Sequence, residues 1–227
     1  MLDMKDKTIL YNALTFWGKL QPEEQEHIFN GAKIRDFEKG ENIHSSSNRC
    51  QGILIVKSGR LRTYILSEEG KEVTLYLLEE GGICVLSASC ILNNITFDVF
   101  IDAEVDSETI LVDLESLKDI SNYVYVENFL LNEAVTRFSD VMWAMEQILF
   151  LKLDQRLAIF LLDEMVRNKS DIILLTHEQI AKYLGSAREA VSRMLSYFSK
   201  EGLVQLKRGE VKVVSKDGLR KVVGLTD

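Results

Sequence analysis

The chain has few of the residues on which metal and disulfide chemistry depend. Its 227 residues include three cysteines and three histidines, and so few cysteines do not make a disulfide framework. The β-rich part holds one histidine, His44, whereas a metal enzyme on such a scaffold brings together several histidines and a glutamate. No Ser/His/Asp triad or phosphate-binding loop is visible either. We therefore expect that the protein is not an enzyme.

Long apolar runs are also missing. No segment approaches the ~18 apolar residues of a membrane span. The N-terminal stretch MLDMKDKTILYNALTF has mixed charge and no apolar core, so it does not resemble a signal peptide. Hydrophobic residues make up 46% of the chain and charged residues 27%, which is typical of globular proteins. We expect a cytoplasmic protein with no membrane partner.

Negative charge is in excess but unevenly spread. The formal net charge is −8. Residues 1–170 carry 17 basic and 28 acidic side chains, whereas residues 171–227 carry ten basic and seven acidic ones. An acidic body with a mildly basic C-terminal part indicates that any polyanion binds the C-terminal part.

The first half of the chain changes from helix to strand patterns. Residues 6–31 have a helical pattern, with Pro22 where a new helix would begin. Glycine-punctuated segments rich in β-branched residues then predict seven short strands in a sandwich or roll. These segments lie between residues 32 and 115 and read KIRDF, ENIH, GILIVKS, RLRTYILS, EVTLYLL, FDVFIDAE and ETILVDL.

Residues 121–151 contain no glycine or proline and predict one long helix. Its apolar positions spread wider than a single stripe, which favours a partner helix from a second subunit. The alternative is a helix that packs only against its own β domain. The candidate interface residues are Phe129, Phe138, Met142, Met145 and Leu149.

A two-helix motif follows another helix at residues 154–167. Thr176 begins a helix over 176–184, Gly185 and Ser186 supply a turn, and a second helix covers 187–200. This spacing is that of a helix-turn-helix, whose second helix enters the major groove of DNA. The next segment predicts a hairpin that turns near Gly209 and would lie over phosphates.

The second helix of this motif has one polar face. Its arginines have the geometry to bind guanine O6 and N7, and Glu189 can accept from cytosine N4. The alternative is a solvated face held by ion pairs within the helix. The predicted DNA contacts are Thr176, His177, Arg188, Glu189, Ser192, Arg193, Ser196, Lys207 and Arg208.

The stretch LTHEQIAKYLGSAREAVSRMLSYFSKEGLV resembles the winged helix-turn-helix of the CRP/FNR family of bacterial transcription regulators. DFEKGENI, VKSGRLR and FLKLDQRLAIFLL resemble that family's roll turns and the end of its dimer helix with the hinge. The resemblance implies an α+β fold with an antiparallel, jelly-roll-like β-roll. It implies a cyclic-nucleotide-binding-like sensor domain at 1–120, a dimerisation helix at 121–152 and a winged helix-turn-helix at 153–227.

The resemblance further implies a homodimer that binds a pseudo-palindromic promoter site in double-stranded DNA, with RNA polymerase as a further partner. In the family, E-x-x-S-R reads a TTGA-like half-site and R-E-x-x-x-R reads TGTGA. This chain has both patterns, so the central G·C pair is assigned to Glu189 and Arg193 while the flanking preference stays open. A ligand-binding module that acts on a protein partner without DNA is the alternative of another class.

The effector is left open by the sequence. Family members that bind cyclic nucleotides carry a motif similar to G-x-x-x-G-E, followed by R-S. This chain lacks both the glycine–glutamate pair and the arginine–serine pair. A phosphate beside Asp98 without a cation would be repelled, so cyclic AMP is not expected. The candidate effector-pocket residues are Cys84, Val85, Leu86, Ser87, Phe97 and Asp98.

The cysteines leave a second set of alternatives. A four-iron cluster needs four thiolates, so the three cysteines make an iron–sulfur cluster an unexpected cofactor. We expect buried cysteines that act as small hydrophobes. The alternative is a redox or gas sensor in which Cys84 and Cys90 form a redox pair, a metal is bound with Cys50 or His44, or haem is bound by Cys84 or His44.

Overall fold

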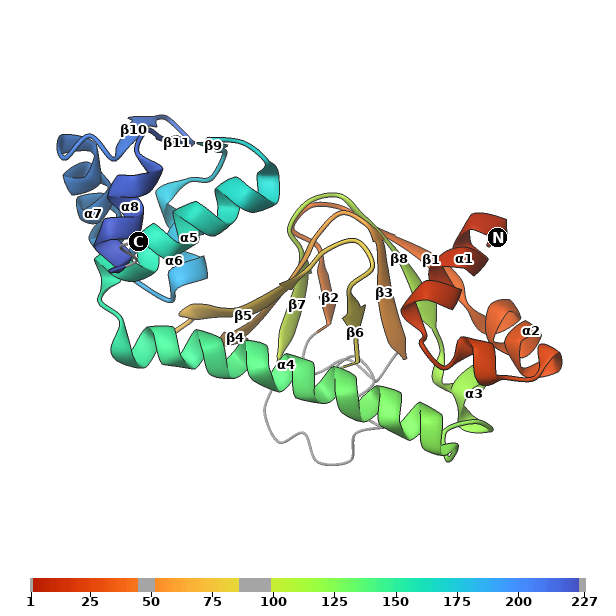
Figure 1. Ribbon diagram of the computed structural model, residues 1–227. Coiled ribbons are helices and arrows are strands. Elements are labelled where there is room, and N and C mark those ends of the chain that lie inside the picture. Colours follow the sequence, from red (N-terminus) through yellow and green to blue (C-terminus); the bar gives the residue numbers. More distant parts are fainter. Residues whose placement is uncertain (1, 45–51, 86–98, 225–227) are drawn as a thin grey trace. The chain divides into compact units, whose positions relative to one another are not determined.

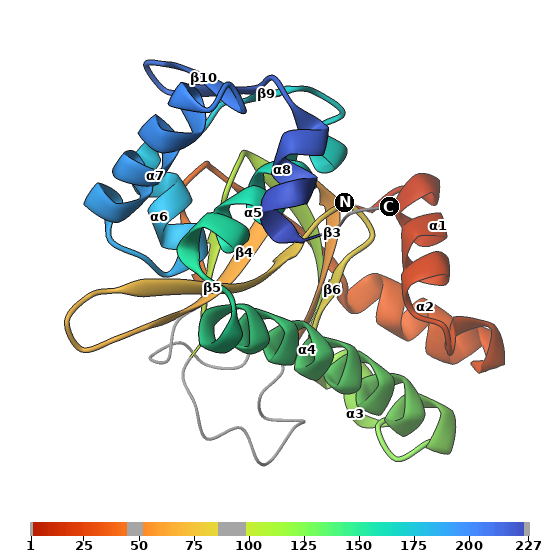
Figure 2. The same cartoon turned by 60° about the vertical axis from the view of Figure 1, so that its left-hand side comes forward.

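The structure is a computed structural model that describes residues 2–44, 52–85 and 99–224 (Figures 1 and 2). The chain forms two compact units. The first unit comprises Met1–Ile65 and Leu75–Val141, and the second comprises Leu66–Thr74 and Met142–Asp227. Each unit has a hydrophobic core of its own.

The first unit begins with helices whose boundaries follow from their capping residues. Asp3 accepts hydrogen bonds from two backbone amides at the start of α1 (Met4–Ala13). A short 3₁₀ turn, η1 (Trp17–Lys19), leads to α2 (Pro22–Gly31). Pro22 occupies the first turn of α2, as predicted, because its fixed φ suits a helix start and its missing N–H is not needed there.

Two four-stranded antiparallel sheets form the β-roll, in the orders β1-β8-β3-β6 and β2-β7-β4-β5. The predicted strands are confirmed as β1 to β5, β7 and β8, while the two-residue β6 was missed because so short a strand has no periodicity to read. The bounds are β1 (Lys33–Phe37), β2 (Asn42–His44), β3 (Ile53–Ser58), β4 (Leu61–Leu66), β5 (Glu72–Leu78), β6 (Ile83–Cys84), β7 (Phe100–Ala103) and β8 (Ser107–Val112).

Strand β3 shows how the roll builds two cores. Ile53 and Ile55 pack in a cluster with the N-terminal helices, whereas Leu54 and Val56 pack in a second cluster with residues of the other sheet. Successive side chains of a strand point to opposite faces, so a run of four apolar residues fits a strand that is buried on both sides. The short helix α3 (Leu114–Lys118) follows β8 and contacts α2.

The predicted long helix is α4 (Val124–Phe150), an uninterrupted element of 27 residues (Figure 1). Its first turns belong to the core of the first unit through Val126, Phe129 and Leu130. The Phe129 ring meets the Phe16 ring edge-on, with 5.1 Å between centroids. Phe129 is therefore removed from the set of interface candidates, because its side chain is already buried inside its own unit.

Besides the end of α4 from Met142 onward, the second unit contains four helices and a small antiparallel sheet among its described residues. In chain order these are α5 (Leu153–Asn168), β9 (Ile172–Ile173), α6 (His177–Leu184), α7 (Arg188–Lys200), β10 (Val204–Lys207), β11 (Glu210–Val213) and α8 (Lys216–Val223). The strand order is β10-β11-β9. Neither β9 nor α8 was predicted from the sequence; α8 starts where Ser215 accepts a hydrogen bond from the Gly218 amide.

Two adjacent aromatic residues of α7 offer a test of this packing. Phe198 is fully buried in the core of the second unit, whereas Tyr197 is 52% exposed. We expect Phe198→Ala to lower the free energy of unfolding by about 3–5 kcal/mol, because it leaves a cavity. Tyr197→Ala should change it by about 0.5 kcal/mol or less. Urea unfolding followed by circular dichroism measures both, and equal losses would contradict the orientation of α7.

Candidate nucleic-acid interface

The first helix of the two-helix motif is fixed at both ends by local hydrogen bonds. At its start the Thr176 hydroxyl accepts from the Gln179 amide, and the Gln179 side chain accepts from the Thr176 amide. At its end Gly185 has φ +54 in the left-handed region, which glycine adopts without steric cost. The chain therefore turns sharply between α6 and α7, and Thr176 acts as a helix cap.

A buried arginine that was not predicted from the sequence holds this turn. Nη2 of Arg156, on α5, donates to the backbone carbonyl of Leu184 over 2.9 Å. Burial lowers the pKa of Arg156, so the bond compensates part of the cost of a cation out of water. Since Leu184 is the last residue of α6, this contact fixes where α7 begins.

Helix α7 separates its residues into two faces. Val191, Leu195 and Phe198 are fully buried against the core of the second unit. The predicted contact residues lie elsewhere on the helix: Arg188, Glu189, Arg193 and Ser196 are exposed, and Ser192 is half-buried. The structure thus brings these five side chains together on one helix, directed away from the core.

The exposed charges of α7 are not neutralised by one another. Glu189 and Arg193 stand four residues apart, a spacing that allows a salt bridge. Within the described part of the chain, however, neither they nor Arg188 form an ion pair. This favours the DNA interpretation over the solvated face held by internal pairs, because the donor and acceptor groups remain available.

The start of α7 has no side-chain cap. Its N-cap residue, Ala187, has no side-chain oxygen for the first amides, which serine, threonine or aspartate would supply at this position. Helix amides without a cap combine with the helix dipole to favour an anion. These amides are chemically suited to a phosphate group, and Arg188 stands at the same end of the helix.

The hairpin after α7 carries exposed cations. Gly209 turns the chain between β10 and β11 with φ +71, and Lys207 and Arg208 are exposed beside it. Lys207 pairs with Glu210 over 3.0 Å. Exposed pairs of this kind contribute little and are screened by salt, so Lys207 can exchange its carboxylate for a phosphate.

A second surface of interest runs along α4. Residues at alternating intervals of four and three form an apolar seam, and all of them are exposed: Leu131, Val135, Phe138, Met142, Met145 and Leu149. This spacing is the heptad pattern of coiled coils. At 1.5 Å per residue the seam is about 27 Å long, and exposed apolar patches of this extent mark interaction sites.

The effector-pocket candidates are described only in part. Cys84 and Val85 are fully buried in the first unit, whereas Leu86, Ser87, Phe97 and Asp98 lie outside the described residues. So do Cys50 and Cys90, so the structure describes neither the cysteine pair nor a site with Cys50. Among the described residues no three His, Cys, Asp or Glu side chains gather as metal ligands.

Several polar groups are buried inside the first unit. The Tyr76 hydroxyl on β5 and the Thr63 hydroxyl on β4 are two of them, and they interact with each other through their side chains. Burial raises the pKa of the Tyr76 hydroxyl, so the group is protonated and a donor. The Arg137 guanidinium of α4 lies 5.1 Å from the centroid of the Tyr76 ring. Nδ1 of His44 is buried and has no hydrogen-bond partner within the described ranges, and burial lowers the pKa of His44.

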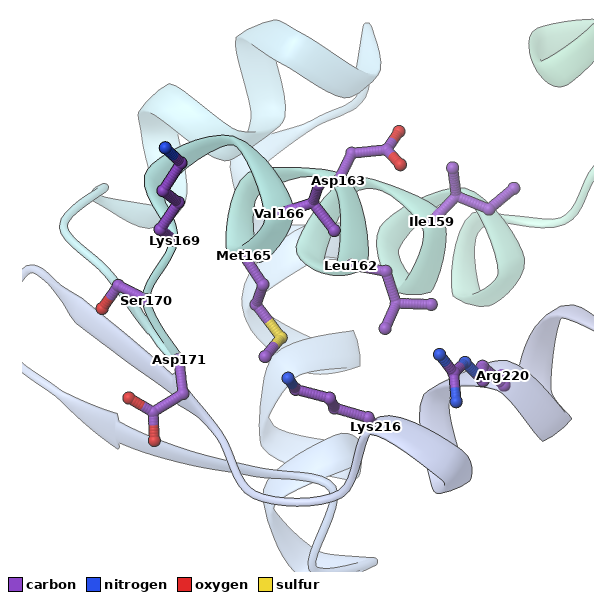
Figure 3. Close-up of a pocket in the computed structure, with 10 residues that line it drawn as sticks. All are labelled: Ile159, Leu162, Asp163, Met165, Val166, Lys169, Ser170, Asp171, Lys216 and Arg220. Carbon is purple, nitrogen blue, oxygen red and sulfur yellow. The ribbon is translucent and has the colours of Figure 1, made fainter.

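A groove of about 470 Å³ lies between α5 and α8 in the second unit (Figure 3). Its lining residues are Ile159, Leu162, Asp163, Met165, Val166, Lys169, Ser170, Asp171, Lys216 and Arg220. Charges of both signs line it, and Arg220 and Asp171 already pair with Asp217 and Lys212. None of the exposed α7 residues lines this groove, so it is separate from the candidate DNA contacts.

The fold and this site together define a class, that of β-roll proteins with a winged helix-turn-helix. Comparison with known families agrees. Residues 34–123 match the cyclic nucleotide-binding domain, and residues 155–222 match the Crp-like helix-turn-helix domain. The chain belongs to the CRP/FNR family and is a transcription regulator with a helix-turn-helix DNA-binding domain and a cyclic-nucleotide-binding-like sensor domain.

Three relatives illustrate the membership. A crystal structure from Eubacterium rectale, described as a transcriptional regulator of the CRP/FNR family, is 42% identical; the match covers 94% of this chain and 99% of that one, with a TM-score of 0.89. Transcriptional regulatory protein btr of Bordetella pertussis is 25% identical, over 82% of this chain and 79% of its own length. Cyclic AMP receptor protein of Thermus thermophilus is 26% identical, over 86% of this chain and 89% of its own length.

None of the described helices combines the length and the apolar content that crossing a bilayer requires. Beside the apolar seam of α4, Arg137 and Asp140 form an ion pair with 2.8 Å between nitrogen and oxygen.

Arg156 provides a test of how the turn is held. We expect Arg156→Met, which keeps the length of the side chain, to lower the free energy of unfolding by about 1–3 kcal/mol because the Leu184 carbonyl loses its donor. Arg220→Met, which breaks an exposed pair with Asp217, should cost about 1 kcal/mol or less. Thermal unfolding measures both; a larger loss for Arg220→Met would contradict the anchoring role of Arg156.

Proposed function

We propose that the chain acts as a homodimer that binds a pseudo-palindromic promoter site with TGTGA- or TTGA-like half-sites. In this proposal residues 1–120 sense a signal, 121–152 form the dimer helix and 153–227 bind DNA in the cytoplasm, with RNA polymerase as the further partner. The observation that carries the proposal is the α7 surface, where Arg188, Glu189 and Arg193 are exposed and form no ion pair with any residue that the structure describes.

The readout follows from the donors and acceptors on that surface. Arg193 offers a fork of N–H groups that fits guanine O6 and N7, and the Glu189 carboxylate fits cytosine N4. The two side chains stand one helical turn apart and so suit neighbouring bases or one G·C pair. Lys207 and Arg208 bind phosphates, and phosphate contacts position the protein without selecting sequence.

The second copy of the chain is the proposed occupant of the α4 seam. A helix presents heptad-spaced apolar residues to a parallel partner helix, and two copies pair the same residues across a two-fold axis. Dimers of helix-turn-helix proteins place their recognition helices one turn of DNA apart, about 34–36 Å. A pseudo-palindromic site follows from that symmetry.

The effector is proposed to act within the β-roll. The interior of the roll holds polar groups, namely the neighbouring hydroxyls of Thr63 and Tyr76 and the Nδ1 atom of His44, which has no hydrogen-bond partner among the described residues. A polar ligand would satisfy such a buried atom. Cyclic AMP is not proposed, because the stretch from Gly81 to Glu104 lacks the glycine–glutamate and arginine–serine pairs that the cyclic-nucleotide-binding members of the family have there. The effector controls DNA binding only if it binds the DNA-competent arrangement more tightly.

Base discrimination tests the proposed readout. We expect Glu189→Ala and Arg193→Ala each to reduce the preference for the selected site over a scrambled duplex by about 1–3 kcal/mol, because each removes one base contact. Fluorescence anisotropy titrations on both duplexes give the ratio of affinities. An unchanged ratio for Glu189→Ala would remove that residue from the readout.

Salt dependence supplies the control and separates the alternative of another class. Lys207→Ala should lower the affinity for both duplexes alike and flatten the slope of affinity against salt by about one. A chain that acts only through a protein partner would show no salt-dependent DNA binding at all. That result would overturn the proposal as a whole.

The oligomeric state of the protein tests whether the seam on α4 is the dimer interface. We expect Met142→Glu to give monomers, because two carboxylates would be buried against each other in the paired helices. Thr136→Glu, at an exposed position of α4 outside the seam, should leave the dimer intact. Light scattering after size-exclusion chromatography measures the mass; a dimeric Met142→Glu protein would place the interface elsewhere.

A further inference from the structure

A hydrogen bond joins the first residue of α6 to the polar face of α7. Nδ1 of His177 and Oγ of Ser192 are 3.0 Å apart. Both side chains are half-buried, so the contact is partly sheltered from water. Ser192 stands one helical turn beyond Arg188, and the bond therefore fixes a polar group in the same row as an arginine assigned to DNA.

The direction of this bond decides what Ser192 can offer to a base. A neutral imidazole has one nitrogen that donates and one that accepts. If Nδ1 of His177 accepts, the Ser192 hydroxyl proton is used, and the Ser192 oxygen can only accept from DNA. If Nδ1 donates, the hydroxyl proton is free, and Ser192 can donate as well.

A contact between His177 and DNA favours the direction in which Nδ1 accepts the hydrogen bond from Ser192. Phosphate oxygens accept hydrogen bonds, and Nε2 of His177 meets that need when it carries the ring proton. Nδ1 is then the accepting nitrogen. The neighbouring Ser196 has its hydroxyl proton in use too, because Ser196 donates to the Ser192 carbonyl over 2.9 Å. Ser192 and Ser196 then present oxygens to DNA that can only accept hydrogen bonds.

The surroundings of His177 keep its ring neutral. Burial lowers the pKa of His177 below the usual 6.5, and the charge of Arg188 on α7 lowers it further. His177 is the first residue of α6, where the helix dipole also disfavours a cation. Glu178, the next residue, is exposed and is the carboxylate adjacent to it on α6. At neutral pH the ring is uncharged, and protonation at lower pH places a proton on Nδ1 and reverses the bond.

We propose that His177 makes Ser192 an obligatory acceptor toward DNA, so that one half-site position favours a base with an amino donor, cytosine N4 or adenine N6. The inference rests on the proposed function, because it requires α7 in the major groove. His177 is a positioning residue here: it acts on base choice through Ser192 and itself contacts at most a phosphate.

Two nearly isosteric replacements of His177 separate this role from a merely structural one. Asparagine keeps an acceptor near the position of Nδ1 but has no proton to gain, whereas leucine keeps the size and has no acceptor. The full-length protein first selects a duplex from a random pool. Affinities are then measured for every single base-pair change in one half-site, at about pH 8 and about pH 5.5, on either side of the usual histidine range.

We expect the wild-type protein to prefer the amino-bearing base at one position by about ten-fold, the discrimination of one good contact, and to lose part of this preference at the lower pH. His177→Asn should keep the preference at both pH values. His177→Leu, Ser192→Ala and the double variant should lose it equally, while the preference that depends on Arg193 stays.

Two results overturn the inference in different ways. If His177→Leu keeps the whole wild-type pattern, or if Ser192→Ala changes no position, His177 does not act on base choice, although loss of preference in Arg193→Ala would still uphold the proposed function. If the wild-type protein binds all duplexes equally, the proposed function itself fails, and this inference fails with it.

Discussion

The DNA-binding unit depends on the way α6 is fixed against α7. Ile180, Leu195 and Phe198 are fully buried in one cluster, and Arg156 holds the last carbonyl of α6 from a third helix. Because these contacts occupy one side of α7, its charged residues lie on the opposite side and face solvent. The exposed face with Arg188 and Arg193 is thus a consequence of core packing, and its chemistry decides what the unit binds.

The long helix α4 has apolar residues for two different neighbours. Its first turns are buried in the core of the first unit, where the Phe129 ring contacts the Phe16 ring. Beyond them the apolar residues continue at heptad spacing but are exposed, with Phe138 at 64% and Leu149 at 65%. A helix that is apolar on several sides needs several neighbours. Here its own unit supplies one of them, and we propose that a second copy of the chain supplies another.

Much of the fold was readable from local patterns. Seven strands, the start of α2 at Pro22, the long helix and the motif from Thr176 to Lys200 were predicted from alternation, capping residues and glycine turns, and the structure has them. Among the described elements, α3, β6, β9 and α8 were not predicted. The two-residue strands β6 and β9 form because neighbouring strands pair with them. Such short strands have no local periodicity from which they could be predicted.

The family, the order of most elements and the polar residues of α7 could be read from the sequence alone, because each is encoded in spacing along the chain. The other features depend on tertiary structure. It removed Phe129 from the exposed face of α4, gave Arg156 its place at the turn and brought His177 to Ser192, fifteen positions away. Contacts between separate elements depend on how those elements pack, and packing is a property of the whole core.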